Sequence, residues 1–393
     1  LSLSMIFSVL PAQSYIFADK LPDISRQESE NSENINDNSS PALQDLIRQA
    51  DNDYKDNDEI KIIVSVNDKT MIQKYGMNVP DLKKLRTEDG LDDRVEYSRE
   101  SQEKLIDQIE DKDVNFDVTE RYDAALNGLA IKTTFKDAKV IAQLPEVNSI
   151  EISKVIPAPV MTSGNIMRPV DFSSNDMVGT GSAWQSEYTG KGKLIAIIDS
   201  GADPNHEIFK KTDDEHLRFK TKEQMDSYLK DKGINYPGDR WFNKKIVYGY
   251  NYADKSSEIK EKSQTSHGMH VAGIIAANLD DKFNQQGKLI KKGLKGVAYD
   301  SQLAILRVFG GGMLGGGTTP EIYNKAIDDA VKLGADSINM SLGATGTTDS
   351  RLEKTTIEAL KNAQQAGIVV AIAAGNDGFM GFQILDGPPS TQL

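Results

Sequence analysis

Four apolar runs that follow residue 193 constrain the fold of this chain more than any other feature. The runs are LIAII (194–198), QLAILRVF (302–309), SINMSL (337–342) and GIVVAIAA (367–374). They do not alternate polar with apolar residues, so each is expected to be a strand buried on both faces of a parallel sheet. Helix-like segments separate the runs, and this order predicts a doubly wound, mainly parallel α/β sheet.

Two predicted helices between these runs carry clear boundary signals. Thr319 can cap the first helix, Pro320 suits its first position and Gly334 ends it. The second helix, over about 351–366, ends at Gly367 in the same way. The apolar face predicted for the first helix consists of Ile322, Ala326, Ile327, Ala330 and Val331.

A smaller unit is predicted over residues 59–155. Its elements are a strand at 60–66, a polar helical stretch to about 110, two strands broken near Asn127 and Gly128, a helix at 137–145 and a strand at 147–153. The order β-α-β-β-α-β indicates helices packed on a small antiparallel sheet. Residues 156–190 are expected to be a linker and an N-terminal arm, which leaves 191–393 for the α/β part.

The N-terminus indicates export. Residues 1–18 are mostly apolar and hold Ala12 and Ala18, small residues suited to signal-peptidase cleavage. They include no initiator Met and no basic start, so we expect a signal peptide clipped at its front; a short buried helix or core strand is the alternative. Residues 19–58 are too polar to offset the entropy of ordering and are expected to be an acidic linker that is disordered or loosely helical.

Composition excludes several classes of protein. Lys and Arg number 46 against 59 Asp and Glu, a net charge of −13, which argues against binding to nucleic acid. The absence of cysteine excludes thiolate metal sites, disulfides and a cysteine nucleophile. Beyond the N-terminus no stretch approaches 18 consecutive apolar residues, so no membrane span is predicted.

Three polar residues at predicted strand ends and turns are candidates for catalysis. In a doubly wound sheet, functional side chains gather at the carboxyl ends of the strands. Asp199 follows LIAII, His267 opens HGMHVAGIIAA, and Asn376 lies in AAGNDG after the last run. Asp and His are two parts of a relay that activates a nucleophile, and an amide in a glycine-flanked loop suits an oxyanion.

Each candidate also has a simpler interpretation. Asp199 can cap a following helix, Asn376 can occupy a left-handed turn, and His267 with His270 has the i, i+3 spacing of a metal pair. The metal alternative is weak because the chain has four His, no Cys and no HExxH glutamate. The joint occurrence of the three residues on one predicted sheet favours the relay.

Four sequence blocks resemble the subtilase family of serine proteases, in that family's chain order. The blocks are IAIIDSGAD, HGMHVAGIIAAN, SINMSLG and AIAAGNDG. HGMH, a long insert before it and the segment NKKIVYGYNYAD are similar to Gram-positive cell-envelope proteinases of the lactocepin and streptococcal complement-cleaving type. The resemblance implies a subtilisin-like fold and a serine endopeptidase that acts on extracellular polypeptides, secreted or associated with the cell wall.

The resemblance also assigns roles to the three candidates. It implies that Asp199 is the relay acid, His267 the base and Asn376 the oxyanion-hole side chain. Residues 59–155 are similar to the family's inhibitor-type propeptide, which would make the protein's own propeptide a partner of the catalytic part. An unrelated ferredoxin-like domain is the alternative for this unit.

Substrate contacts follow from the same resemblance. Ser341, Leu342 and Gly343 match the strand that pairs with substrate backbone, and Gly311 and Gly312 match the loop on the other side of the groove. A flexible solvent loop is an equal alternative for these two glycines. The chemistry requires no cofactor. Calcium supports many subtilases, but no DxDxDG-like cluster places a calcium site here.

The nucleophilic serine of the family belongs to a GTSM-type block, which does not occur in these 393 residues. Ser390 follows two prolines rather than leading a helix, so it is not a candidate. We expect the nucleophile beyond residue 393 and the chain by itself to be inactive. The rival interpretations are a peptide-binding pseudo-protease or truncated product, and a metal-dependent hydrolase.

Overall fold

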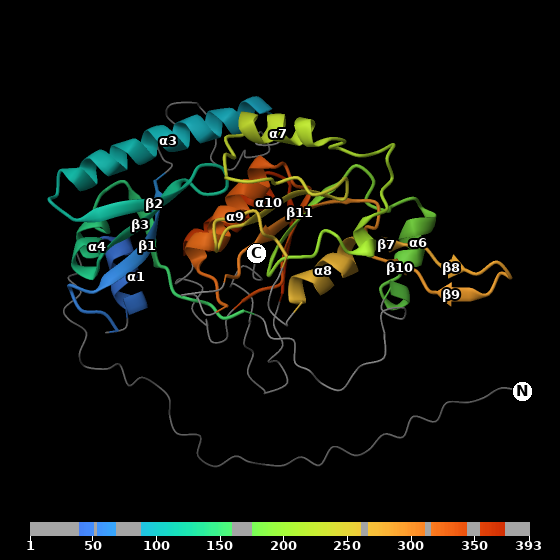
Figure 1. Cartoon of the computed structure of the whole chain (residues 1–393). Helices are drawn as coiled ribbons and strands as arrows, with labels where there is room; N and C mark the ends of the chain where they lie inside the picture. Colours follow the sequence, from blue (N-terminus) through green and yellow to red (C-terminus); the bar gives the residue numbers. More distant parts are fainter. Residues whose placement is uncertain are drawn as a thin grey trace, which may run out of the picture. The chain divides into compact units, whose positions relative to one another are not determined.

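The computed structural model describes residues 39–50, 53–67, 88–158, 175–260, 266–310, 316–343 and 354–373 (Figure 1). From Ser40 onward these residues form one compact unit. Two sheets organise it, a four-stranded antiparallel sheet built from residues 59–152 and a five-stranded parallel sheet built from residues 194–372. Among the described residues, no helix combines the length and apolar character needed to cross a membrane.

The parallel sheet confirms the predicted fold class. Its strand order is β13-β12-β5-β11-β6, and every neighbouring pair is parallel. The strands are β5 (Leu194–Asp199), β6 (Ile246–Asn251), β11 (Gln302–Arg307), β12 (Ser337–Met340) and β13 (Val369–Ile372). Asp199 is level with Arg307 of β11, and Ile198 is level with Met340 of β12, so the ends of three strands meet at one edge.

Helices cover both faces of this sheet, as a doubly wound fold requires. Leu194, Ala196 and Ile198 of β5 pack in the same core as helices α9 (Pro320–Lys332) and α10 (Lys354–Gln365). Ile197 points to the opposite face and packs with α8 (His267–Ala276). The alternation along β5 therefore decides which helix each side chain meets. Among the described residues, this part also contains α6 (Thr180–Gln185), α7 (Lys222–Asp231) and the short 3₁₀ helix η2 (Glu207–Phe209).

Three details of this part differ from the predictions. The strand β6 was not predicted, because IVYGYN alternates aromatic and other residues rather than forming an aliphatic run. The strand β13 lies at the sheet edge with Val369 67% exposed, so it is not buried on both faces. Thr319 precedes α9 but makes no capping hydrogen bond, and its buried hydroxyl has no hydrogen-bond partner within the described part of the chain.

The antiparallel sheet has the order β2-β3-β1-β4. Its elements match the predicted β-α-β-β-α-β order and are β1 (Glu59–Val66), α3 (Glu88–Glu110), β2 (Phe116–Tyr122), β3 (Gly128–Thr134), α4 (Phe135–Ile141) and β4 (Val147–Ile152). The helix α4 begins earlier than predicted, because the Thr134 side chain accepts a hydrogen bond from the amide of Asp137 and caps it. It also ends well before Pro145.

Helix α1 (Pro41–Ala50) lies within the segment 19–58 and shows that the disordered alternative is wrong for these ten residues, which form a packed helix. Ser40 caps it by accepting the amide of Leu43, and Ala42, Leu46 and Ala50 recur every fourth residue on a buried face. This face packs on the antiparallel sheet. The Gln49 side chain also bonds the backbone of β4 through Ile150 O at 2.8 Å and Ile152 N at 2.6 Å. The polar average over residues 19–58 gave no indication of this short amphipathic helix.

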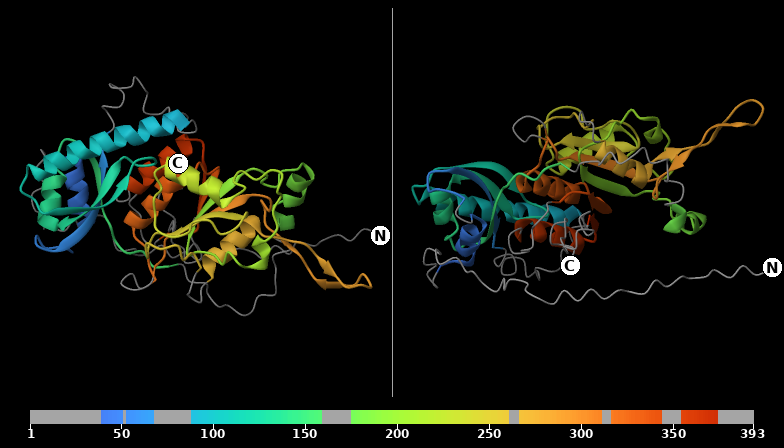
Figure 2. Two further views of the ribbon diagram at one scale, coloured as in Figure 1. Left: turned by 45° about the horizontal axis from the view of Figure 1, so that its top comes forward. Right: turned by 90° about the horizontal axis from the view of Figure 1, so that it is seen from below.

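A two-stranded hairpin extends from the parallel-sheet part. Strands β7 (Asn278–Leu279) and β10 (Leu294–Lys295) pair at its base, and β8 (Lys282–Phe283) pairs with β9 (Leu289–Lys291) further out. Figures 1 and 2 show the β8–β9 hairpin projecting away from the sheet in every view.

Candidate active site

Asp199 and His267 meet at the carboxyl edge of the parallel sheet. The Nδ1 atom of His267 lies 2.8 Å from Oδ1 of Asp199. The Asp199 side chain is 1% exposed and that of His267 20%. Because a carboxylate only accepts hydrogen bonds, Nδ1 is the donor, and the lone pair of the neutral ring then lies on Nε2. A buried carboxylate therefore fixes the tautomer of a partly exposed imidazole.

The backbone around this pair is tied together by Ser200 and Gly268. Ser200 N–H donates to Asp199 Oδ1 at 2.7 Å, and Gly268 N–H donates to Ser200 Oγ at 2.9 Å. A Cβ on Gly268 would lie 2.4 Å from Gly201 O and 3.1 Å from Asp199 Oδ1. Only glycine therefore lets the first turn of α8 approach the end of β5 closely enough for the hydrogen bond to His267.

The second oxygen of Asp199 is left without a comparable partner. Oδ2 is buried and has no hydrogen bond within the described part of the chain. Within the described part of the chain, Oδ1 accepts the hydrogen bonds of both Ser200 and His267. An incompletely satisfied buried acid is costly for stability unless its charge has a use, and the adjacent imidazole supplies one.

Sequence reasoning missed the residue that supports this edge from the neighbouring strand. Arg307 is level with Asp199 and is 7% exposed. Its guanidinium donates to the carbonyl oxygens of Lys260 at 2.8 Å, Phe309 at 3.2 Å and Glu258 at 3.3 Å. The signal was an arginine inside an otherwise apolar run, which indicates a buried cation with assigned acceptors.

Residues 258–260, two of whose carbonyl oxygens bind Arg307, also contact the loop that follows Asp199. Ala202 N–H donates to Ile259 O at 3.0 Å, and a Cβ on Gly201 would lie 2.2 Å from that oxygen. Gly201 has φ +112°, a conformation open to glycine. Lys260 pairs with Asp203 at 2.7 Å. The hydrogen bond from Lys260 holds the pKa of Asp203 below its ordinary value.

The predicted substrate strand follows β12 at the same edge. Ser341 comes directly after Met340, which is level with Ile198, so Ser341 lies next to the position of Asp199 in register. Its hydroxyl accepts a hydrogen bond from the Asn339 side chain at 3.0 Å. Leu342 is buried, and Gly343 is partly exposed.

Three predicted site residues lie outside the described residues: Asn376, Gly311 and Gly312. Their roles stay predictions. The structure therefore brings together the predicted acid, the predicted base and the start of the predicted substrate strand.

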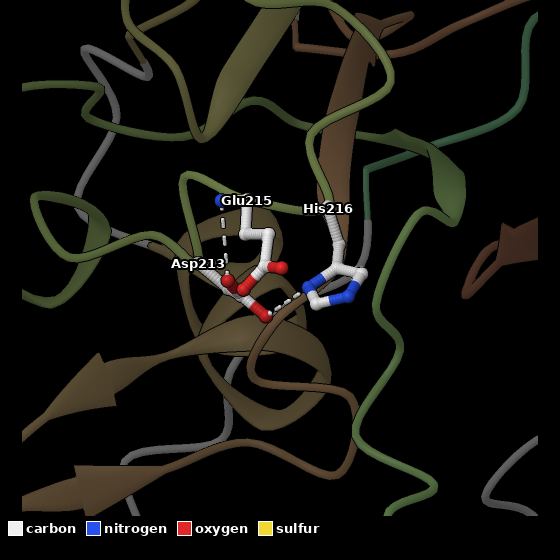
Figure 3. Close-up of side chains that lie close together, drawn as sticks. All are labelled: Asp213, Glu215 and His216. Carbon is white, nitrogen blue, oxygen red and sulfur yellow. Dashed lines mark hydrogen bonds and ion pairs between the residues drawn. The ribbon is translucent and has the colours of Figure 1, made fainter.

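Asp213, Glu215 and His216 are close enough to offer three ligand atoms to a metal ion, all within 4.8 Å of one another (Figure 3). The Asp213 carboxylate is already engaged by the other two residues: Nδ1 of His216 lies 2.9 Å from its Oδ2, and the backbone N–H of Glu215 donates to its Oδ1 at 3.3 Å. Lys191 Nζ lies 3.8 Å from the same Asp213. Glu215 and His216 are exposed, so we assign no metal to this turn.

A second buried carboxylate, Asp328 of α9, joins the two sheets. Its Oδ1 accepts the backbone amides of Ala124 and Ala125, both at 2.8 Å. Lys332 Nζ lies 3.4 Å and Lys325 Nζ 3.7 Å from Oδ2. Burial acts to raise the pKa of Asp328, but the two lysines and the two amides together hold it below its ordinary value.

Further contacts join the antiparallel unit to α9 and to the segment before it. The carboxylate of Glu321 accepts from Lys61 and from Thr119, each at 2.8 Å. Ile156 and Thr318 exchange two backbone hydrogen bonds of 2.7 and 2.8 Å, an antiparallel bridge. Side chains of both units form one continuous buried core. The chain after β4 therefore runs alongside the segment that precedes α9.

The segment YGYNYAD, singled out by its resemblance, has a structural role. Tyr252 OH donates to Asp329 Oδ2 at 2.9 Å and lies 3.0 Å from Tyr248 OH. The Tyr250 ring stacks on Tyr236 with centroids 4.2 Å apart. Burial raises the pKa of Tyr252 well above its ordinary value, so its hydroxyl stays protonated and donates a hydrogen bond to α9.

A parallel α/β sheet with an Asp–His pair at its carboxyl edge is an arrangement found in α/β serine hydrolases. Residues 190–392 match the subtilase family, and this chain belongs to that family. The "PI-type proteinase" of Lactococcus lactis subsp. cremoris is 32% identical over 264 residues, which cover 67% of this chain and 13% of that protein. The "C5a peptidase" of Streptococcus pyogenes serotype M3 is 34% identical over 193 residues, 49% of this chain and 15% of that protein.

The chain thus spans a small part of the length of the relatives it matches. Among solved structures, the epidermin leader peptide processing serine protease EpiP from Staphylococcus aureus aligns with 82% of this chain and 61% of that chain. The TM-score is 0.44 and the sequence identity 19%.

Proposed function

We propose that this chain is part of a serine endopeptidase in which Asp199 is the relay acid and His267 the general base. The observation that carries the proposal is the 2.8 Å contact between Asp199 Oδ1 and His267 Nδ1, in a chain of the subtilase family. The nucleophilic serine and the oxyanion donor Asn376 belong to the proposal but not to the described residues.

The roles follow from the chemistry of the pair. With Nδ1–H held by Asp199, Nε2 of His267 can take the proton of a serine hydroxyl as that oxygen attacks a peptide carbonyl. The imidazolium that forms is stabilised by the buried carboxylate. His267 then returns the proton to the leaving amine, and water repeats the cycle on the acyl-enzyme. Asn376 would donate to the oxyanion.

We further propose that residues 59–155 act as the protein's own inhibitor-type propeptide. Asp328 and Glu321 anchor this unit to α9. The Ile156–Thr318 bridge supports the idea that its tail continues towards the substrate groove as an extended strand. Polypeptide substrates would then replace this tail and pair with Ser341–Gly343 on the other side of the groove. We propose an extracellular or wall-associated location on the strength of the predicted signal peptide.

The test needs the product of the whole gene. The wild-type protein should release its propeptide and cleave a denatured protein substrate, whereas His267→Ala should do neither. His206→Ala is the matched control, since His206 caps η2 and should leave both activities intact. Normal maturation of the His267→Ala protein would refute the assignment. Loss of cleavage in wild type with retained peptide binding would support a pseudo-protease instead.

In the 393-residue chain itself the relay is testable without turnover. Nitrogen-15 chemical shifts of the imidazole should show His267 as the Nδ1–H tautomer. Asp199→Asn should change that tautomer preference, because the amide can present either a donor or an acceptor to the ring. An unchanged His267 spectrum in Asp199→Asn would mean that the carboxylate does not fix the ring.

A further inference from the structure

The β8–β9 hairpin has two unlike faces. In its register Lys282 is opposite Lys291 and Phe283 is opposite Leu289. Paired residues share a face and successive residues alternate, so the two lysines lie on one face and the two apolar side chains on the other. The lysine face is turned to the body of the protein, because both lysines contact Glu207 of η2.

The other face is exposed and apolar. On this face Phe283 is 58% exposed and Leu289 45%. Ile290, the unpaired extra residue next to Leu289, is 65% exposed. In Figures 1 and 2 the hairpin extends away from the two sheets. Three large apolar side chains gathered on one small projecting element indicate an interaction surface.

The charge of this element is opposite to that of the chain. Residues 278–295, the hairpin with its base, contain five lysines against the two acids Asp280 and Asp281, whereas the whole chain carries −13. Lys288 and Lys292 flank the apolar residues and are exposed. An anionic surface would repel most of this protein and attract the hairpin, which fixes how the protein approaches it.

The tip of the hairpin limits how it can bind. The Asn284 side chain accepts the amides of Gln286 at 3.0 Å and Lys288 at 2.8 Å, which makes a compact polar turn. A polar tip does not enter hydrocarbon point first. An apolar side with lysines beside it instead suits an element that lies flat at an interface between apolar chains and anionic headgroups.

We propose that the β8–β9 hairpin is a peripheral docking element for an anionic lipid bilayer. Phe283, Leu289 and Ile290 enter the interfacial region, and Lys288 and Lys292 contact the anionic headgroups. The hairpin follows α8, which begins at His267, so the proposed active site is connected through one helix to the element that meets the membrane. This inference does not depend on the proposed peptidase activity.

The test uses the full 393-residue chain and vesicles of phosphatidylcholine, with or without 30% phosphatidylglycerol. The chain has no cysteine, so Gln286→Cys provides a single site for an environment-sensitive fluorophore. We expect its emission to shift with anionic vesicles and not with phosphatidylcholine alone. The same label at Ser227→Cys, on α7, should not respond. Since every variant keeps the apolar residues 1–18, the hairpin label separates hairpin docking from binding by the N-terminus.

Substitutions then divide the two contributions. Lys288→Gln with Lys292→Gln should weaken anionic-vesicle binding about fivefold per lysine, and 0.5 M salt should do the same to the wild type. Phe283→Ser with Leu289→Ser and Ile290→Ser should weaken it at least ~10-fold. Lys210→Gln with Lys230→Gln, two exposed lysines elsewhere, should have little effect. Circular dichroism should show all variants folded, because the substituted side chains are exposed.

Several outcomes would overturn the proposal. One is a label response that is equal for neutral and anionic vesicles, or absent for both. A second is unchanged binding in the apolar triple variant. A third is a response to soluble polyglutamate as large as that to vesicles, which would indicate an acidic polymer as partner. A fourth is a dimer that the triple variant dissociates, which would make a second copy of the chain the occupant.

Discussion

Asp199 and Asp328 are two buried carboxylates that their surroundings turn to different purposes. They are 1% and 0% exposed, and both accept backbone amides. Lys325 and Lys332 compensate the charge of Asp328, and the carboxylate joins two units of the molecule. Asp199 faces a single imidazole and keeps one oxygen without a hydrogen bond among the described residues. Burial alone therefore does not mark a candidate catalytic acid. Both carboxylates have ionisable neighbours, but only that of Asp199 is an imidazole, which can take up and release a proton near neutral pH.

The largest expected effect tests the functional side of this comparison. In the product of the whole gene, Asp199→Asn should lower kcat about 10⁴-fold, the loss found for this substitution in another serine protease with the same relay. Its effect on unfolding should be small, since the amide keeps the shape of the site. Hydrolysis of a fluorogenic peptide and urea unfolding measure the two. A loss of activity below tenfold would place Asp199 outside the relay.

Asp328→Ala should give the largest loss of stability. The substitution leaves Lys325 and Lys332 buried without the carboxylate of Asp328 and removes the acceptor of two backbone amides. We expect it to lower the free energy of unfolding by about 3–5 kcal/mol. Urea unfolding of the whole chain should show it, and hydrogen exchange should locate the loss at α9 and residues 123–125. Glu103→Ala, which removes an exposed ion pair with Arg121, is the control and should cost under ~1 kcal/mol.

The lowered pKa of Asp328 adds a dependence on acid. An aspartate whose pKa is lower in the folded protein than in the unfolded chain stabilises the fold above the unfolded value of about 4. That stabilisation is lost as the pH falls through the folded pKa. Stability should therefore drop below about pH 4, and Asp328→Asn should flatten this part of the pH profile. An equally steep acid limb in the variant would assign it to other carboxylates.

Lys245 extends the comparison to a buried cation without a carboxylate bonded to it. Its Nζ donates to Tyr299 O at 2.6 Å, and burial lowers its pKa to about 7. The unfolded chain binds this proton more tightly between pH 7 and about 10.4, so raising the pH over that range should stabilise the fold. Lys245→Met should remove up to a few kcal/mol of this rise, measured by urea unfolding at pH 7 and 9.5. Parallel profiles would contradict the assignment.

The smallest expected effect concerns the link between the acid and α8. Ser200→Ala removes the acceptor of the Gly268 amide and should cost about 1 kcal/mol in unfolding. If the link also positions His267, the variant should lose activity with little change in KM. Thr212→Ala, which removes an exposed hydroxyl contact with Asp214, is a matched control. A Ser200→Ala protein with wild-type kcat would show that the hydrogen bond serves stability alone.

The sequence predicted the parts of the molecule that depend on local pattern. Apolar runs marked four of the five parallel strands, and Gly334 and Gly367 marked helix ends where φ is +63° and +84°. Average composition did not predict α1. Its five buried residues lie in a polar stretch, and they stabilise a helix only because they pack against the antiparallel sheet. The prediction missed strand β6 for a related reason, since its tyrosines Tyr248 and Tyr250 are buried in a core that they share with side chains of α9.

By itself the sequence determined that Asp199 ends a buried strand and that His267 opens a helix, because both positions follow from periodicity and punctuation. Only the tertiary structure decided that the two side chains meet, through the crossover that returns α8 to the end of β5 and the missing Cβ of Gly268. It also decided that Asp328, one acid among 59, bridges two units. The end of a strand can be predicted from residues near in sequence, whereas the role of a buried charge depends on which residues contact it in the folded structure.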